Sequence, residues 1–255
     1  MNNLVLTDQD GPVTTMTLNH AARHNSLTPE FLSVIHQKLT NLPAQTRVMV
    51  LQANGRSFST GGDLKSFQEH GHDLPSYAEQ IVGRLHEVIL AMLDLDIPVI
   101  TAVHGIVTGG SLGLILASDI VLVTLEASFT PYYPVVGFSP DGGWSAWLAT
   151  IIGQRRTAAS LFYNRTITAE DAVAWGLASR LVEGQDLAAT ALETARRICS
   201  MKSGSIKHSK QLLGANRHFV AELLEKERRH FVQQIGTVEA QQGLAAFLAR
   251  LQVST

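Results

Sequence analysis

Cysteine is almost missing from this chain of 255 residues, since Cys199 is the only one. A single thiol excludes an internal disulfide framework and suits a reducing compartment, so we expect a cytoplasmic protein. The first residues lack a basic segment followed by an apolar run, and they therefore do not predict a secretion signal. The longest apolar stretch, residues 106–123, is interrupted by glycine, serine and aspartate, which predicts a buried segment rather than a membrane span.

An excess of charge of either sign is missing as well. The chain has 20 Lys and Arg against 22 Asp and Glu, a formal net charge of -2. This balance gives no electrostatic reason to expect nucleic acid or an anionic membrane as a partner. No Gly-x-Gly-x-x-Gly opens a helix after the first strand, and no Gly-Lys-Ser/Thr phosphate loop occurs, which argues against a dinucleotide site.

A cluster with metal-ligand character is also hard to find. His70, His72 and Asp73 lie close together, but they fall in a polar, glycine-containing stretch where histidines are usually solvated. We therefore predict no metal site, and Cys199 has no evident base partner that would make it reactive.

Strand-like and helix-like segments alternate along the chain, and 45% of the residues are hydrophobic, enough for a large core. Strands are predicted at residues 13–18, 47–53, 98–103 and 120–125. Helices are predicted from Thr28, at 76–94, after Gly109-Gly110, and near 144–152, 155–162, 169–175 and 187–201. This order predicts an α/β layer structure with a largely parallel sheet. We expect the core to span residues 1–200 and a helical region to span residues 201–255.

The stretch 218–251 has the pattern of a helix throughout. Its apolar positions are more numerous than one helix buries alone: Phe219, Leu223, Phe231, Phe247, Leu248 and Leu251. This surplus indicates packing on another subunit, although docking on the chain's own core is equally compatible with the periodicity.

Two glycine-rich junctions each follow a predicted strand. The first contains Gly61-Gly62 and the second contains Gly109-Gly110. Glycine lets the backbone approach a ligand closely, and a loop that runs into a helix aims N–H groups at it. Two such loops would form an oxyanion hole that stabilises developing negative charge. A pair of tight turns with no ligand is the alternative, because isolated glycine patterns are weak signals.

Several motifs together resemble the enoyl-CoA hydratase/isomerase (crotonase) family over about residues 10–250. They are, in order, Asn25-Ser26-Leu27, Phe58 through Leu64, His104-Gly105 through Gly109-Gly110, Ala117 through Ile120, Gly137 through Gly143, Ala169 through Ala172 with Trp175-Gly176-Leu177, and Ala246-Phe247-Leu248. The resemblance implies a crotonase-like spiral of ββα units, with C-terminal helices that assemble a homotrimer or homohexamer. It also implies an acyl-CoA thioester as substrate and no permanently bound cofactor.

The resemblance assigns roles to particular residues. It places the thioester oxygen between the N–H groups of Gly62 and Gly110. The residues that it assigns to the rest of the CoA thioester are Arg23, His24, Asn25, Gly61, Asp63, Leu64, Tyr133 and Lys226, with Arg229 as an alternative to Lys226 near the phosphates.

The chain departs from the family's hydratases at their two catalytic glutamates. The matching positions hold Gly113 and Tyr133, and neither exchanges a proton as a carboxylate does near neutral pH. Asp141 remains, at the position where the family's enoyl-CoA isomerases carry their single acid and its 4-chlorobenzoyl-CoA dehalogenases carry a nucleophile. We expect an apolar site to raise the pKa of Asp141 by desolvation. Its residues are Phe138, Trp144, Tyr132 and Tyr133. Read without the resemblance, an Asp before a helical run is a helix cap.

His86 is the second candidate catalytic residue, because the dehalogenases have a histidine at the matching place. A histidine that faces solvent or Glu87 on an amphipathic helix is the alternative. The favoured function is an enoyl-CoA isomerase that acts through Asp141. The alternatives are hydratase-like, dehalogenase-like or thioester-cleaving chemistry, and a non-catalytic acyl-CoA-binding oligomer.

Overall fold

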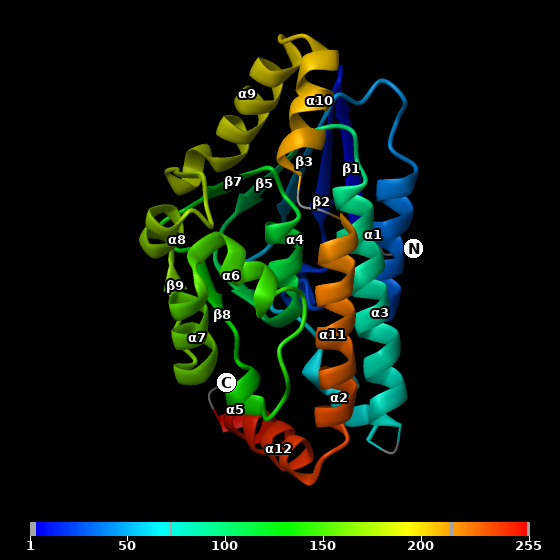
Figure 1. The fold of residues 1–255 in the computed structure, drawn as a ribbon, viewed down its shortest axis with the longest axis vertical. Coiled ribbons are helices and arrows are strands. Elements are labelled where there is room, and N and C mark those ends of the chain that lie inside the picture. The colour runs from blue at the N-terminus through cyan, green and yellow to red at the C-terminus, as the bar shows by residue number, and fades with distance from the viewer. Residues whose placement is uncertain (1–3, 72, 215–216, 254–255) are drawn as a thin grey trace.

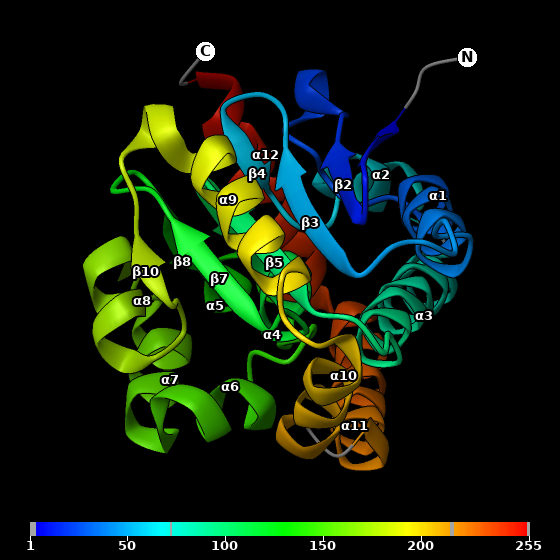
Figure 2. The same ribbon diagram turned by 90° about the horizontal axis from the view of Figure 1, so that it is seen from above.

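Two sheets form the centre of the computed structural model, which describes residues 4–71, 73–214 and 217–253 (Figures 1 and 2). The larger sheet has six strands in the order β1 (Val5–Asp10), β2 (Val13–Leu18), β3 (Val48–Ala53), β5 (Val99–Val103), β7 (Ile120–Val123) and β10 (Arg180–Leu181). The smaller sheet has four, in the order β4 (Ser57–Ser59), β6 (Ile106–Thr108), β8 (Ser128–Thr130) and β9 (Ile167–Thr168). All pairs are parallel except β1 with β2 and β8 with β9, so the predicted parallel sheet is confirmed.

The chain repeats one unit three times. A strand of the larger sheet is followed by a strand of the smaller sheet and then by a helix: β3 and β4 lead into α2, β5 and β6 into α4, and β7 and β8 into α5. This is the expected spiral of ββα units. Because β4, β6 and β8 are neighbours in parallel register, the loops that follow them come together at one edge of the smaller sheet.

The predicted helices are present in the expected order, and α2, α5 and α10 are additional to them. They are α1 (Pro29–Thr40), α2 (Leu64–Glu69), α3 (Leu74–Leu93), α4 (Leu112–Leu116), α5 (Tyr133–Val136), α6 (Ala146–Ile152), α7 (Gln154–Tyr163), α8 (Ala169–Trp175), α9 (Leu187–Cys199), α10 (Ser203–Leu213), α11 (Arg217–Ile235) and α12 (Val238–Val253). The start of α1 shows why the sequence predicted a helix from Thr28. The Thr28 side chain accepts a hydrogen bond from the Phe31 N–H at 3.2 Å, and Pro29 takes the first helical position.

Alternation along the strands divides the interior into two cores. Val48 and Val50 point to the face that α9 covers, whereas Met49 and Leu51 point to the face covered by α1 and α3. The α9 face is the smaller core, and the other face continues into the smaller sheet and the helices around α4.

The C-terminal helices dock on the chain's own core. Helix α11 lies along α3, where Arg217 pairs with Asp94 at 2.5 Å and Arg228 pairs with Glu79 (Figure 1). Phe231 and Leu248 of the predicted apolar set are buried, while Phe219 and Leu251 are 46% and 50% exposed. Packing on the chain's own core therefore accounts for the buried residues of the C-terminal helices. Assembly with other copies of the chain stays a prediction. The expected continuous helix over 218–251 was wrong, because α11 ends at Ile235 and α12 begins at Val238.

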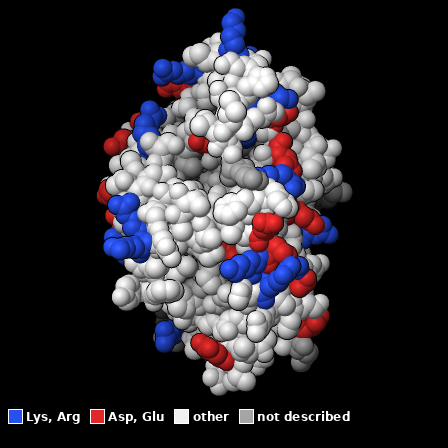
Figure 3. Space-filling view, viewed as in Figure 1, with Lys and Arg blue, Asp and Glu red and all other residues white. Residues whose placement is uncertain are grey.

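The charged side chains on the surface fit the small formal net charge of -2. On the face shown in Figure 3, acidic and basic side chains are intermingled over α11 and α3, where Arg228 and Arg229 pair with Glu225 and Glu79. Within the described residues, no helix is long and apolar enough to cross a membrane.

Candidate active site

The two glycine loops pack directly against each other. Gly61 has φ +70°, and a Cβ there would lie 2.5 Å from the carbonyl oxygen of Thr108. A side chain at this position would therefore force the loops apart, which explains the glycine. The first loop also pairs with Leu27, whose N–H donates to the Gly61 carbonyl at 2.7 Å.

Gly110 lies in the short helical turn Gly109–Ser111 that leads into α4. The N–H groups at the start of a helix have no acceptor within it, so this one is available to a ligand. A Cβ on Gly110 would lie 2.9 Å and 3.2 Å from the two carboxylate oxygens of Asp141. The predicted oxyanion residue and the predicted acid are thus direct neighbours.

Asp141 is buried, with 7% of its surface exposed. The Tyr133 hydroxyl donates to its Oδ1 at 2.5 Å and also lies 3.0 Å from its backbone carbonyl. Burial raises the pKa of Asp141 to about 6, although the Tyr133 hydrogen bond lowers it. The alternative that this carboxylate caps a helix is wrong: α6 begins at Ala146, its N-cap is Ser145, and no side-chain cap bond forms there.

The two positions of the hydratase glutamates have other uses here. A Cβ on Gly113 would lie 2.3 Å from Ile89 Cδ1 and 3.0 Å from the Gly142 carbonyl oxygen, so side-chain packing already fills that space. Tyr133 is fully buried against Asp141, and burial keeps the pKa of its phenol well above its usual value. Tyr133 therefore stays protonated and serves as a hydrogen-bond donor to the acid.

The aromatic residues near the acid divide into two groups. Trp144 is fully buried and donates its Nε1–H to the Gly109 carbonyl at 2.7 Å, and Phe138 is also buried. Tyr132 is 38% exposed and packs on Phe247 at 5.7 Å between ring centroids. The expectation that both tyrosines line the apolar site therefore holds for Tyr133 and not for Tyr132.

The residues expected to hold the CoA portion lie around the first glycine loop. Buried Asn25 donates to the carbonyl oxygens of Asn54 and Ser57 at 2.9 Å and 3.0 Å, which fixes this segment to β4. His24 Nδ1 lies 3.1 Å from Ser57 Oγ. Arg23 pairs with Asp63.

Asp63 has a structural task of its own, since it caps α2, which begins at Leu64. Its carboxylate accepts from the N–H groups of Lys65 and Ser66 at 3.1 Å and 3.4 Å. The contacts of these residues with CoA stay predictions.

His86 is buried on α3, so the alternative that it faces solvent or Glu87 was wrong. Glu87 instead pairs with Arg84 at 2.7 Å. Burial lowers the pKa of His86 to about 4, so the ring is neutral near neutral pH. Within the described residues its Nε2 has no hydrogen-bond partner, and a catalytic role for it stays a prediction.

Glu227 on α11 is the buried acid that the sequence analysis missed. Its Oε2 accepts from the Gly143 N–H at 2.7 Å, and its Oε1 accepts from the Ser145 N–H at 2.9 Å and from the Ser145 hydroxyl. Burial raises the pKa of Glu227 to about 7. The signal was present, because Glu227 occupies the buried stripe of α11 between Leu224 and Phe231. The neighbouring Lys226, predicted near the CoA phosphates, is exposed.

No grouping that suits a metal ion occurs within the residues that the structure describes. His72, part of the weak histidine pattern, lies outside the described residues.

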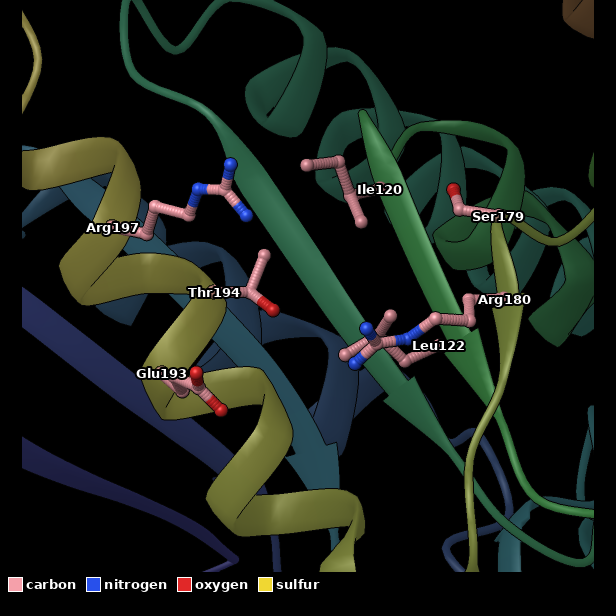
Figure 4. A pocket seen from close by; sticks show the side chains of 7 residues that line it. All are labelled: Ile120, Leu122, Ser179, Arg180, Glu193, Thr194 and Arg197. Carbon is pink, nitrogen blue, oxygen red and sulfur yellow. The ribbon is translucent and has the colours of Figure 1, made fainter.

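A separate hollow lies away from these loops. Figure 4 shows it, about 250 Å³ in volume, between α9 and the β7–β10 edge, with Arg180 and Arg197 at opposite sides. It belongs to the α9 face of the sheet, whereas Gly110 packs on Leu85 in the other core.

Comparisons with known proteins agree with this arrangement. The family model described as enoyl-CoA hydratase/isomerase matches residues 8–254. The chain is 28% identical over 229 residues to 4-chlorobenzoyl coenzyme A dehalogenase-2 of Arthrobacter sp., covering 88% of this chain and 81% of that one. It is 26% identical over 254 residues to the 1,2-epoxyphenylacetyl-CoA isomerase of Escherichia coli K12, covering 98% and 97%.

A solved structure gives the same fold. The enoyl-CoA hydratase from Bacillus halodurans superimposes with a TM-score of 0.89 at 23% identity, over 95% of this chain and 99% of that chain. With the family model matched over nearly the whole chain and the glycine loops meeting as the family requires, the protein belongs to the enoyl-CoA hydratase/isomerase (crotonase) family.

Proposed function

We propose that the protein is an enoyl-CoA isomerase that moves a carbon–carbon double bond toward the thioester, with Asp141 as its acid–base residue. The observation that carries this proposal is the contact between the Asp141 carboxylate and Gly110, with Gly113 and Tyr133 in place of the two hydratase glutamates. Among the buried acids of the described chain, Asp141 is the one whose carboxylate lies beside Gly110. The other two are Asp63, which caps α2, and Glu227, which accepts from Gly143 and Ser145.

A single carboxylate is sufficient for this reaction. Asp141 removes a proton from C2 of a 3-enoyl thioester, and the resulting dienolate carries its charge largely on the thioester oxygen. The N–H groups of Gly62 and Gly110 stabilise that oxygen. The same carboxyl group then returns the proton to C4, so no second acid is needed.

The environment of Asp141 suits both halves of the cycle. With its pKa raised to about 6 by burial, the carboxylate is mostly ionised at neutral pH and its conjugate acid remains a competent donor. Tyr133 donates to Oδ1, and Oδ2 is the carboxylate oxygen nearer the Gly110 Cβ position, so we assign Oδ2 to the substrate's proton. Isomerisation of 1,2-epoxyphenylacetyl-CoA, the reaction named for the Escherichia coli relative, would use the same acid and the same oxyanion hole.

A second candidate is attack by the Asp141 carboxylate on the halogen-bearing ring carbon of a haloaryl-CoA, which expels halide and leaves an aryl ester on Asp141. Water activated by His86 then hydrolyses that ester, which restores the carboxylate and releases a hydroxyaryl-CoA. The sequence similarity to the Arthrobacter dehalogenase favours it, as does the buried, neutral His86 with no partner on Nε2 in the described chain. The dehalogenases carry a tryptophan where Tyr133 stands, and this difference speaks against it. Hydration of a 2-enoyl thioester requires a carboxylate to activate water, and the closed space at Gly113 leaves none there.

Substrate binding and assembly are part of the same proposal. Arg23, His24, Asn25 and Lys226 would contact the CoA portion, while Gly61, Asp63 and Leu64 would shape the entrance to the oxyanion hole. The C-terminal helices would assemble a homotrimer or a homohexamer. A non-catalytic acyl-CoA-binding oligomer is disfavoured, because such a protein has no need of a buried carboxylate against Gly110.

A panel of thioesters tests the proposal. The purified protein is assayed with 3-enoyl-, 2-enoyl- and aryl-CoA compounds, and the products are identified by mass spectrometry and ultraviolet absorbance. We expect conversion of a 3-enoyl to a 2-enoyl thioester. Rapid hydration of 2-enoyl-CoA without isomerisation, release of halide from a haloaryl-CoA, or release of free acid from an aryl-CoA would replace the isomerase assignment with the hydratase, dehalogenase or thioester-cleaving alternative, respectively.

A further inference from the structure

The loop that carries Asp141 is held from behind by a residue of the C-terminal helices. Glu227 of α11 is 5% exposed, and its two carboxylate oxygens accept three hydrogen bonds from Gly143 and Ser145. All three donors lie within four residues of Asp141. A carboxylate from outside the spiral thus caps the turn that precedes α6.

Tyr133 and Trp144 also hold this loop through their hydrogen bonds to Asp141 and Gly109, but neither provides an acceptor for the N–H groups of the turn. Gly142 and Gly143 have φ of +64° and +89°, in the left-handed region. Ser145, the N-cap of α6, makes no side-chain cap hydrogen bond. The N–H groups of Gly143 and Ser145 therefore depend on Glu227 as their acceptor, and buried N–H groups rarely go without one.

The loop also bears directly on the oxyanion residue. A Cβ on Gly142 would lie 2.4 Å from the carbonyl oxygen of Gly110, so the two backbones are in contact. A shift of the 141–145 turn would therefore move the Asp141 carboxylate relative to the Gly110 N–H. An error of about 1 Å in such a geometry costs an enzyme about 10²-fold in rate.

We propose that Glu227 is a positioning residue that holds the 141–145 turn so that the Asp141 carboxylate lies over Gly110. The inference rests on the proposed function, since it assigns Glu227 a role through Asp141. Glu227 itself contacts the backbone of the turn and Ser145, and it does not reach the reacting atoms. Helix α11 thereby contributes to the site as well as to the fold.

The substitution Glu227→Gln is the sharpest test, because it keeps the size of the side chain and changes one oxygen into an NH₂ group. The amide oxygen still accepts from one side of the turn, while the NH₂ group faces a backbone donor on the other. Glu225→Gln is the matched control, since Glu225 lies on the same helix and pairs with Arg228 and Arg229 at the surface. Both variants are checked by circular dichroism and thermal melting before assay.

We expect Glu227→Gln to lower kcat by about 10- to 100-fold with little change in KM, because the acid is displaced while the CoA contacts persist. Glu225→Gln should keep parental kcat and KM. Ser145→Ala removes only the hydroxyl bond to Glu227 and should cause a smaller fall in kcat. This variant also keeps the test decisive if Glu227→Gln does not fold.

A double-mutant cycle separates positioning from a general structural role. If Glu227 acts through Asp141, then Glu227→Gln causes no further loss in an Asp141→Asn background. The same cycle is run with Ser145→Ala. Equal losses with and without the Asp141 carboxylate would overturn the positioning role, as would unchanged kcat in both variants.

Failure of the proposed function gives a different pattern. If Asp141→Asn retains parental turnover, the acid–base assignment falls whatever Glu227→Gln does. If the parent turns over only aryl-CoA or 2-enoyl-CoA, the isomerase assignment falls and the cycle is run on that substrate. If no thioester is turned over, both proposals fall.

Discussion

Asp141 and Glu227 are two buried carboxylates on opposite sides of one turn, and their hydrogen bonds differ. Tyr133 donates a side-chain hydrogen bond to Oδ1 of Asp141, and a hydrogen bond from the residue's own backbone also lowers its pKa. Glu227 has both oxygens in use, with two backbone N–H groups and one hydroxyl as donors. Burial raises the pKa of both groups, to about 6 and about 7 respectively.

This difference in hydrogen bonding distinguishes a reactive carboxylate from a structural one when both are buried. A carboxylate whose two oxygens both accept hydrogen bonds from one turn organises that turn, whereas a carboxylate that lies against an oxyanion residue is placed to exchange a proton with substrate. A perturbed pKa by itself does not make this distinction, because desolvation acts on both groups.

The largest expected effect is on the rate after Asp141→Asn. The amide keeps the size of the side chain and its oxygen can still accept from Tyr133, but it cannot remove a proton. We expect kcat to fall by at least about 10²-fold, the usual scale of general acid–base catalysis, with little change in melting temperature. Near-parental kcat on the best substrate would mean that Asp141 is not the reactive carboxylate.

The next effect is on stability after Glu227→Ala. This change leaves the N–H groups of Gly143 and Ser145 buried without their acceptor, at about 1–3 kcal/mol for each unsatisfied group. We expect the free energy of unfolding, measured by urea titration, to fall on that scale. Glu225→Ala is the control, since surface ion pairs contribute about 0–1 kcal/mol. Equal losses for the two variants would deny Glu227 its structural role.

The pH dependence of kcat/KM, which reports groups of the free enzyme, sharpens the description of Asp141. The base must be ionised, so the acid limb of the profile should lie near pH 6 in the parent. The Tyr133 hydroxyl favours the ionised form, so Tyr133→Phe should raise the pKa of Asp141 and move this limb to higher pH. Tyr132→Phe is the matched control, because Tyr132 packs on Phe247 instead. If the acid limb of the Tyr133→Phe profile stays at the parental pH, that limb belongs to a group other than Asp141.

The smallest effect concerns Lys226, the exposed neighbour of Glu227. If Lys226 contacts the CoA phosphates, Lys226→Gln should raise KM by no more than about fivefold and leave kcat unchanged, since exposed ion pairs contribute about 0–1 kcal/mol. The rise should shrink at high salt because the pair is screened. An unchanged KM at low salt would remove Lys226 from the CoA site.

Sequence patterns found four strands of the larger sheet and most of the longer helices, because each is encoded locally, whereas the short strands of the smaller sheet were missed. Val13–Leu18 and Val99–Val103 are apolar and β-branched, and Thr28 with Pro29 marks the start of α1. Strand β1 was missed because Val5–Asp10 is mostly polar and exposed, and its pairing with β2 supplies what its own pattern lacks. The end of α11 at Ile235 was missed for the opposite reason, since apolar spacing continues across the break.

The sequence by itself determined the resemblance to the family, the alternation of the main strands and helices, the two glycine loops and the absence of the hydratase glutamates. These are properties of residue type and of short-range spacing. The spiral of ββα units was expected only from the resemblance. Only the tertiary structure decided that Asp141 lies against Gly110 rather than capping a helix, that His86 is buried, and that Tyr133 donates to the acid. It also revealed Glu227, which is 86 positions from Asp141 in the chain and is brought to it by the packing of α11 on the core. Such contacts depend on how distant elements pack, and no local pattern encodes that packing.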